Sequence, residues 1–198
     1  MPTIIDSFPS PSLDATKWNI ALEGGASYAV GSPIDGVYPQ GIDDQGDGLI
    51  VDSEGKIVVP SGSFDVSIFY ADVFVDPEED IFSFLGWRSN QLDLEGNPAF
   101  AVDVLLSARS GPVFEFQKAT VNLGSYNRTT IISDPTNGAD GGFRIVRNWM
   151  NYSLFYFDGV SFQPLAVENI PHNGAGYIVF GQVAESFMLE AFPWVSQT

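Results

Sequence analysis

The chain of 198 residues has no cysteine, one histidine and only eight lysine and arginine residues. Disulfide bonds are therefore excluded, and so are zinc sites built from cysteines or from several histidines of one chain. The 25 acidic residues give a net charge of −17, and such a surface repels nucleic acids and anionic membranes. The composition excludes a nucleic-acid partner and suits a divalent cation, a salty environment or a basic partner.

Long apolar runs are also missing, because none approaches the roughly 18 residues of a membrane-spanning helix. The first residues, MPTIIDSFPSPSLD, lack the basic start and the apolar stretch of a signal peptide. We therefore expect neither membrane insertion nor a signal peptide. Apolar residues make up 44% of the chain, which is enough for a folded core, and we expect one domain over residues 1–198.

What the sequence does contain is apolar residues at every second position, which is typical of β-strands. In SFDVSIFY, Phe64, Val66, Ile68 and Tyr70 share one face of the expected strand. Residues 143–165 predict three strands, with a first turn between Asn148 and Asn151 and a type I′ turn at Asp158-Gly159. Residues 176–195 predict a closing pair of strands. About a dozen short strands, spaced roughly 8–12 residues apart along the sequence, predict an antiparallel sandwich of two sheets.

One segment is ambiguous, because residues 96–111 carry signals of both a helix and a strand. Asn97, Pro98 and Gly111 stand where a helix would have its N-cap, its first residue and its end. Phe100, Val102 and the apolar residues that follow alternate strictly, however, and this alternation favours a strand.

Three stretches resemble the concanavalin-A-like lectin and glucanase domains, which include laminin-G-like domains: FPSPSLDATKWNI, GGFRIVRNWMNYSLFYFDGVSFQPL and GYIVFGQVAESFMLEAFPW. They are similar to that superfamily's opening turn, late hairpin and closing strands. The resemblance implies an all-β jelly roll, which is a two-sheet antiparallel β-sandwich. Since these motifs are packing patterns, they indicate the fold and say little about function.

Residues 43–54, DDQGDGLIVDSE, nearly match an EF-hand calcium loop. The flanks contradict that reading, because glycine and proline precede the loop and an expected strand, residues 55–60, follows it. We expect a polar loop that feeds a hairpin turning at residues 53–56, and no metal. A calcium site of another kind on Asp43, Asp44 and Asp47 remains open, since a cation would relieve the repulsion of three close carboxylates.

Glycan-cleaving members of the superfamily use paired carboxylates on the concave sheet. Glu78, Glu79 and Asp80 supply half of the laminarinase-type pattern, but Phe82 and Ser83 stand where its second glutamate is needed. Glu115 and Glu190 are isolated carboxylates in apolar strands and form the alternative catalytic pair. We expect no catalysis, with this pair as the runner-up.

His172, in the sequence IPHNG, is expected to be an exposed loop residue, since no nucleophile motif accompanies it.

The turn Asn-Trp-Met-Asn is unusual, because turns normally carry small polar residues. Trp149 and Met150 either fold back onto the core or contact something outside the domain. Tyr126, Trp87 and Trp194 fit core packing, but exposed aromatics on one face would form a lectin-like platform. We take Trp149, Met150, Tyr126 and Trp87 as the candidate ligand or interface residues.

Two functions remain open, besides a third reading as a cytosolic domain with an unknown protein partner. The first is a non-catalytic binding or structural module, most readily a bacteriophage virion protein such as a capsid decoration protein or a tail or fibre adhesin. Its partners would be other virion subunits or surface glycans, homo-oligomers are left open, and it would act in the virion or outside cells after lysis. The second is a glycoside hydrolase or lyase of the same fold.

Overall fold

The computed structural model describes residue 8 and residues 12–30, 37–42, 47–70, 81–108, 114–134 and 141–184. These residues form thirteen strands and no helix. Because every strand pair is antiparallel, the expected all-β antiparallel fold is confirmed. The expectation of one domain over residues 1–198 stays a prediction.

The larger sheet has seven strands in the order β1-β4-β13-β6-β7-β8-β9. Their bounds are Asn19–Glu23, Gly48–Asp52, Gly176–Ala184, Ile81–Ser89, Phe100–Ala108, Phe114–Asn122 and Ser125–Asp134. The smaller sheet has four strands in the order β12-β11-β10-β5, bounded by Phe162–Asn169, Asn151–Phe157, Gly141–Asn148 and Ser63–Tyr70. A separate ribbon pairs β2 (Ser27–Val30) with β3 (Val37–Gln40).

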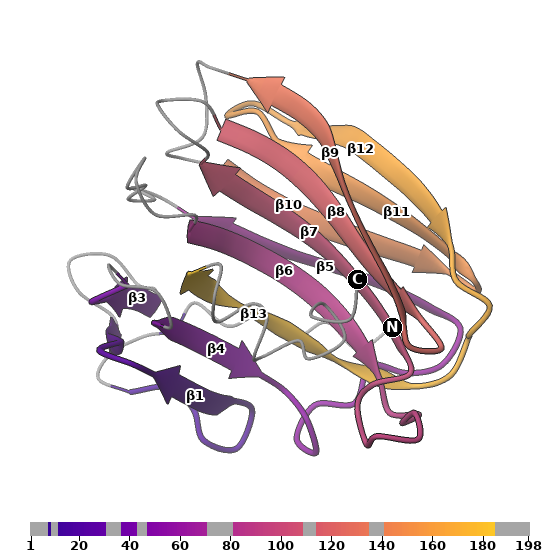
Figure 1. Cartoon of the computed structure of the whole chain (residues 1–198), viewed down its shortest axis with the longest axis horizontal. Helices are drawn as coiled ribbons and strands as arrows, with labels where there is room; N and C mark the ends of the chain where they lie inside the picture. Colours follow the sequence, from indigo (N-terminus) through magenta and orange to yellow (C-terminus); the bar gives the residue numbers. More distant parts are fainter. Residues whose placement is uncertain are drawn as a thin grey trace.

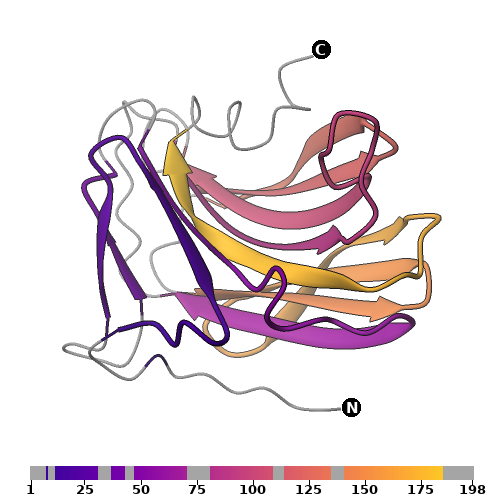
Figure 2. The same ribbon diagram turned by 90° about the horizontal axis from the view of Figure 1, so that it is seen from below.

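The two sheets lie face to face, with the four-stranded sheet behind the seven-stranded sheet in Figure 1. Figure 2 shows them as two layers and shows that the seven-stranded sheet is bent, so that its outer face is concave. Alternation explains the layers, because it gives each strand of the four-stranded sheet one apolar face. Inward side chains such as Trp87, Val104, Ile145 and Leu154 fill the space between the sheets.

The strand β6 differs, because all nine of its residues are buried. Leu85 and Trp87 belong to the core between the sheets, whereas Phe82 and Phe84 belong to a second apolar cluster. This second cluster lies on the outer face of the seven-stranded sheet, since its members alternate with the inward residues. A buried outer face matters for function, because that is the face where a glycan-cleaving enzyme of this fold needs open carboxylates.

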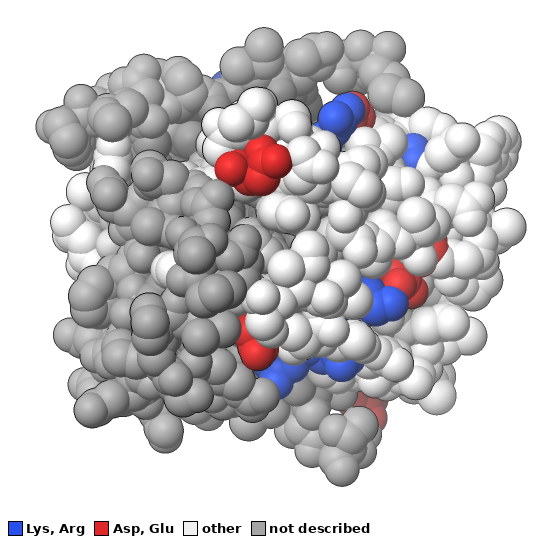
Figure 3. Space-filling view, turned by 90° about the horizontal axis from the view of Figure 1, so that it is seen from above, with Lys and Arg blue, Asp and Glu red and all other residues white. Residues whose placement is uncertain are grey.

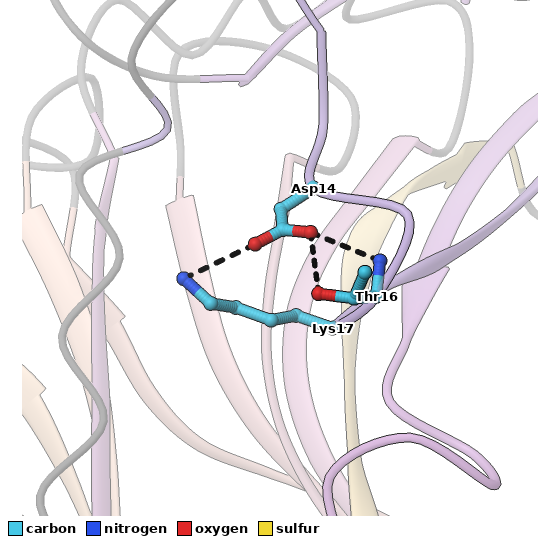
Figure 4. Close-up of polar contacts among 3 residues, drawn as sticks. All are labelled: Asp14, Thr16 and Lys17. Carbon is cyan, nitrogen blue, oxygen red and sulfur yellow. Dashed lines mark hydrogen bonds and ion pairs between the residues drawn. The ribbon is translucent and has the colours of Figure 1, made fainter.

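The turn before β1 begins the sandwich and holds its first strand in place (Figure 4). The Asp14 carboxylate accepts hydrogen bonds from the backbone N–H of Thr16 (2.9 Å) and from its hydroxyl (2.7 Å), and it lies 3.5 Å from the Lys17 ammonium. The hydrogen bonds from Thr16 are the main reason that the pKa of Asp14 is lowered. Trp18 then packs its ring on Phe180 of β13, with 5.3 Å between the ring centroids.

The ambiguous segment is a strand, since β7 runs from Phe100 to Ala108. Two local expectations were wrong. Residues 55–60 form no strand, because only Val59 makes an isolated bridge, with Gly176. The second turn is not a two-residue type I′ turn: Phe157 pairs with Phe162, so four residues connect the strands. Asp158 accounts for the longer loop, because its carboxylate accepts the backbone N–H groups of Val160 and Ser161, each at 2.8 Å.

Charges on the described surface often lie in opposite pairs. Figure 3 shows acidic and basic side chains side by side among uncharged atoms. The Arg144 guanidinium binds both carboxylate oxygens of Asp65, at 2.8 and 2.6 Å, and Lys118 of β8 pairs with Glu168 of β12. No helix within the described residues is both long and apolar enough to cross a membrane.

Candidate functional site

The centre of the concave face is occupied by a buried ion pair between neighbouring strands. Arg88 on β6 and Asp103 on β7 approach to 2.5 Å, and both side chains are almost fully buried. Gly86 makes room for the pair, because a Cβ atom there would collide with the Asp103 carboxylate and lie 2.7 Å from an Arg88 nitrogen. The pair is therefore part of the packed face and is closed to solvent.

Burial also shifts the pKa values of this face. It raises the pKa of Asp103, and the neighbouring Arg88 opposes that rise. Burial likewise raises the pKa values of Tyr126 and Tyr177 to about 12. The hydroxyl of Tyr126 is buried and has no hydrogen-bond partner within the described part of the chain. Both phenols therefore stay neutral at physiological pH.

The runner-up catalytic residue Glu115 lies on the same face, as the second residue of β8. Its carboxylate accepts hydrogen bonds from Gln117 Nε2 and Thr130 Oγ1, each at 3.2 Å, and lies 3.5 Å from Ser133 Oγ. Glu115 pairs with Ser107, which is four positions from Asp103 on β7, a separation of about 14 Å. Its proposed partner, Glu190, lies outside the described residues, as do Glu78, Glu79 and Asp80.

Asp52 is the other carboxylate in the row of Asp103. The register runs from Asp52 through Val179 and Gly86 to Asp103, which is about 14 Å across three strand spacings. Glycosidases need their two carboxyl groups about 5–10 Å apart. Among the described strands, the concave face therefore brings no two carboxylates to catalytic distance.

The candidate calcium residues are only partly placed, since Asp43 and Asp44 lie outside the described residues. Asp47 is buried, and its carboxylate accepts the backbone N–H of Gly25 at 2.6 Å. Its backbone carbonyl accepts the N–H of Ala184, so Asp47 also ties the start of β4 to the end of β13. No group of three or more acidic or histidine side chains that could hold a metal occurs within the described ranges.

The hairpin tip between β10 and β11 projects its two side chains outward. Trp149 is 62% exposed and Met150 is 43% exposed, so Trp149 does not fold back onto the core. The register pairs Asn148 with Asn151, which confirms the expected two-residue turn. Trp149 has a φ of +58°, a left-handed conformation that costs a non-glycine residue free energy. A bulky aromatic residue is therefore held in a strained and exposed position.

Hydrogen bonds fix the backbone of this tip. Trp149 donates its N–H to the carbonyl of Gly62 (3.1 Å), and the Met150 carbonyl accepts the N–H of Ile170 (2.9 Å). The buried Arg147 donates from Nε to the Trp149 carbonyl (2.8 Å) and from a terminal nitrogen to the Gly174 carbonyl (2.9 Å). The tip is thus rigid in its backbone while its side chains remain in solvent.

Arg147 lies in an aromatic enclosure within the core. Its guanidinium carbon is 5.7, 5.1 and 5.6 Å from the ring centroids of Phe64, Trp87 and Tyr152. Within the described residues no carboxylate pairs with it, and burial lowers its pKa. The ring faces therefore stabilise the cation in place of an anion.

The candidate aromatic residues do not form one platform. Trp87 is fully buried, and its ring contacts the Arg147 guanidinium inside the core. Tyr126 is half-buried on the opposite, concave face, against the second apolar cluster. Trp194 lies outside the described residues. Among the candidates that the structure describes, only Trp149 and Met150 are exposed.

His172 lies in a loop, as expected, but the expectation that it is exposed was wrong, because the residue is half-buried. Its ring stacks on Phe100, with the centroids 4.7 Å apart and the planes at 13°, and it lies 5.9 Å from the Trp87 ring. Its Nε2 is buried without a hydrogen-bond partner in the described structure. Burial lowers the pKa of His172, and the charge of Arg147 lowers it further.

Sequence reasoning missed Arg88, Asp103 and Arg147. Arg88 and Asp103 are each the one charged residue of their strand, and a lone charge in such a position is a usable signal. Arg147 shares β10 with Arg144 and gave no such signal. Arg88 and Asp103 were not paired in advance because their contact depends on the register of β6 and β7. An exposed aromatic group on the outer face of the four-stranded sheet, which includes Phe69, was also missed.

No model of a known protein family matches the sequence, and no curated protein matches it either. Solved structures do match. A legume lectin-like domain from Entamoeba histolytica has a TM-score of 0.55 at 10% identity, over 92% of this chain and 91% of that one. A GlcNAcα1-4Gal-releasing endo-β-galactosidase from Clostridium perfringens has a TM-score of 0.60 at 10% identity, over 89% of this chain and 54% of the enzyme.

A family 16 endo-glucanase from Bacteroides ovatus also matches, with a TM-score of 0.50 at 11% identity, over 90% of this chain and 85% of that one. The chain therefore has the concanavalin-A-like jelly-roll fold that lectin-like domains and family 16 glycoside hydrolases share. At these identities the likeness concerns the fold alone. It fits a binding domain and a hydrolase equally well.

Proposed function

We propose that this protein is a non-catalytic, glycan-binding domain. The observation that carries the proposal is the Arg88–Asp103 ion pair, which occupies the centre of the concave face where a hydrolase of this fold needs an accessible acid. Within the described strands, the other carboxylates near Asp103 on that face, Glu115 and Asp52, are each about 14 Å from it by strand geometry. Both distances exceed the separation that glycoside hydrolysis requires.

We further propose that the tip residues Trp149 and Met150 make the contact with the ligand or with a partner. Backbone strain at an exposed aromatic residue stabilises nothing in the isolated domain, and such strain is commonly found at functional sites. Tryptophan is enriched at interface hot spots, and methionine adapts to irregular surfaces. The hydrogen bonds that Trp149 accepts from Arg147 and donates to Gly62 support this role, because a fixed backbone lowers the entropy lost on binding.

The setting proposed from the sequence is a bacteriophage virion, with other virion subunits or surface glycans as partners and self-association left open. The net charge of −17 favours partners that are neutral or basic over anionic ones. The lectin-like and glycan-acting neighbours favour a glycan among these partners.

The proposal is tested by combining a glycan-binding array with an assay for released reducing ends. We expect retention of at least one glycan and no turnover of β-glucans, galactans or their oligosaccharides. Release of reducing ends by the purified protein that Glu115→Gln abolishes would establish the hydrolase instead. Lys118→Gln is the matched control, since it alters a charged residue of the same strand, outside the Glu115 hydrogen-bond network.

The tip is tested with Trp149→Ala and Trp149→Gly. We expect both variants to weaken binding by about 2 kcal/mol or more, the usual effect of truncating a hot spot. Trp149→Gly should unfold at the same temperature as the unmodified protein or higher, because glycine adopts a positive φ without strain. Loss of about 3 kcal/mol of folding stability in both variants would show a packing role and overturn this assignment.

A further inference from the structure

The outer face of the four-stranded sheet carries a group of exposed phenylalanines far from the tip. Phe69, Gly142, Phe157 and Phe162 occupy one row across β5, β10, β11 and β12. The three rings contact one another, with centroids 5.3 to 5.6 Å apart. Phe69 is 61% exposed, and the other two rings are half-buried. We call these three rings the Phe platform.

Glycine at position 142 is what allows the rings to meet. A Cβ atom there would lie 3.0 Å from the Phe69 ring and 2.8 Å from the Ile68 carbonyl. Phe69 and Phe157 therefore close over the backbone of β10, and each ring supports its neighbours. Because the rings hold one another in place, the platform loses little side-chain entropy when a ligand binds.

The charged groups beside the platform already have partners within the chain. Asp65 and Arg144 form a bidentate pair, and the Arg144 guanidinium lies 5.6 Å from the Phe162 ring centroid. The Asp158 carboxylate accepts two backbone N–H groups and Gln163 Nε2. Asp65 and Arg144 balance each other's charge, and Asp158 stays ionised but is hydrogen-bonded within the chain. These groups therefore offer no free cation to recognise an acidic ligand. Exposed Ser67 and half-buried Ser153 on the same face supply neutral hydrogen-bonding groups.

The exposed area of the platform limits the size of its occupant. A phenylalanine side chain covers roughly 200 Å², so one ring mostly exposed and two half-buried rings leave about 200 Å² in solvent. A stable protein interface needs about 800 Å² on each partner. Two copies of this chain would also repel each other, since each has a net charge of −17. The area suits a ligand of one or two sugar rings.

We propose that Phe69, Phe157 and Phe162 form a stacking platform for the pyranose rings of a neutral glycan, which is a second contact site on the outer face of the four-stranded sheet. The C–H groups on one face of a pyranose ring form an apolar surface that packs on an aromatic ring, while its hydroxyl groups remain available to serines and water. The inference rests on the proposed glycan-binding function, and it concerns a different surface from the tip.

The test is calorimetric titration with hexasaccharides of glucose, galactose and xylose, and with acidic hexasaccharides that contain uronic acid. We expect Phe69→Ala and Phe162→Leu to weaken binding of at least one neutral hexasaccharide tenfold or more. Val167→Ala is the matched control, because this valine is also exposed on the same sheet face and should leave affinity within twofold. Unchanged melting temperatures would show that both phenylalanine variants remain folded.

Each outcome separates the two proposals. If Trp149→Ala abolishes binding while both platform variants bind normally, the platform is overturned and the tip stands. If the platform variants lose binding and Trp149→Ala does not, the platform stands and the tip assignment fails. Binding of acidic hexasaccharides only, or of none of the sugars, would overturn the platform.

Discussion

Arg147 and Trp149 are joined by a hydrogen bond from the guanidinium Nε to the tryptophan carbonyl, at 2.8 Å. Arg147 is 1% exposed, whereas Trp149 is 62% exposed. The most exposed aromatic side chain of the hairpin is therefore held by a buried cation two residues before it. This arrangement links the stability of the core to the conformation of the proposed contact site.

Replacing Arg147 should destabilise the fold and release the tip. Arg147→Met leaves the carbonyls of Trp149 and Gly174 without their donor, and we expect a loss of about 2–4 kcal/mol. Arg147→Lys should lose less, since it keeps the charge near the rings and one donor. Chemical denaturation monitored by tryptophan fluorescence measures both changes. A neutral effect of Arg147→Met would mean that the burial of the cation costs as much as its contacts contribute.

The closed ion pair on the concave face gives a second prediction. Gly86→Ala places a Cβ atom against the Asp103 carboxylate, so we expect it to displace the pair and to cost about 3 kcal/mol or more, as for a broken buried ion pair. Gly25→Ala is the control, because its Cβ atom would lie 3.6 Å from the nearest atom. Equal stability of the two variants would show that Arg88 and Asp103 separate easily, and a closed concave face would then be untenable.

Much of the fold could be predicted, because strand alternation is a local property of the sequence. The faces of β5, the turn at Asn148 and Asn151, and the strand at Phe100 all followed from period-two patterns and turn residues. The failures have local causes as well. Residues 55–60 look like a strand but meet only one partner, through Val59, and Asp158 enlarges a loop that its Asp-Gly sequence predicts to be short.

The site was less predictable, since it depends on register between strands that are distant in the sequence. The Phe platform brings together residues 69, 157 and 162 across three strand pairs. Nothing within the local sequence of Phe69 indicates Phe157 as its neighbour. The environment of His172 is hidden for the same reason, because Phe100 and Trp87 come from β7 and β6.

Calcium should leave the melting temperature unchanged. One carboxylate oxygen of Asp47 accepts a hydrogen bond from the Gly25 N–H. Asp47→Ala removes this bond and should therefore lower the melting temperature with or without calcium. Asp43→Asn is the more informative variant, since it removes the negative charge of a potential ligand and leaves the Asp47 side chain unchanged. A rise in melting temperature with added calcium that Asp43→Asn removes would establish the alternative cation site.

His172, as the only histidine, gives a pH dependence that can be assigned to one residue. Its pKa is lowered in the folded protein by burial and by Arg147, whereas the unfolded chain has a pKa of about 6.5. The unfolded state therefore binds more protons as the pH falls through 6.5, and the folded state loses stability on acidification. The stabilisation that comes from the lowered pKa of His172 is fully present above about pH 6.5. It is lost as the pH falls toward the pKa of His172 in the folded protein.

His172→Phe keeps a ring against Phe100 and removes the titrating group. We expect the unfolding free energy of the unmodified protein to fall more steeply than that of His172→Phe between pH 7.5 and 5.5. The difference in slope cannot exceed about 1.4 kcal/mol per pH unit, the limit for one proton, and solvent exposure reduces it. Urea denaturation at several pH values measures both slopes. The variant is the control for the carboxylates, because it keeps all of them and lacks only the histidine. Parallel slopes would show that the His172 ring titrates as it does in water, and that Arg147 does not act on it.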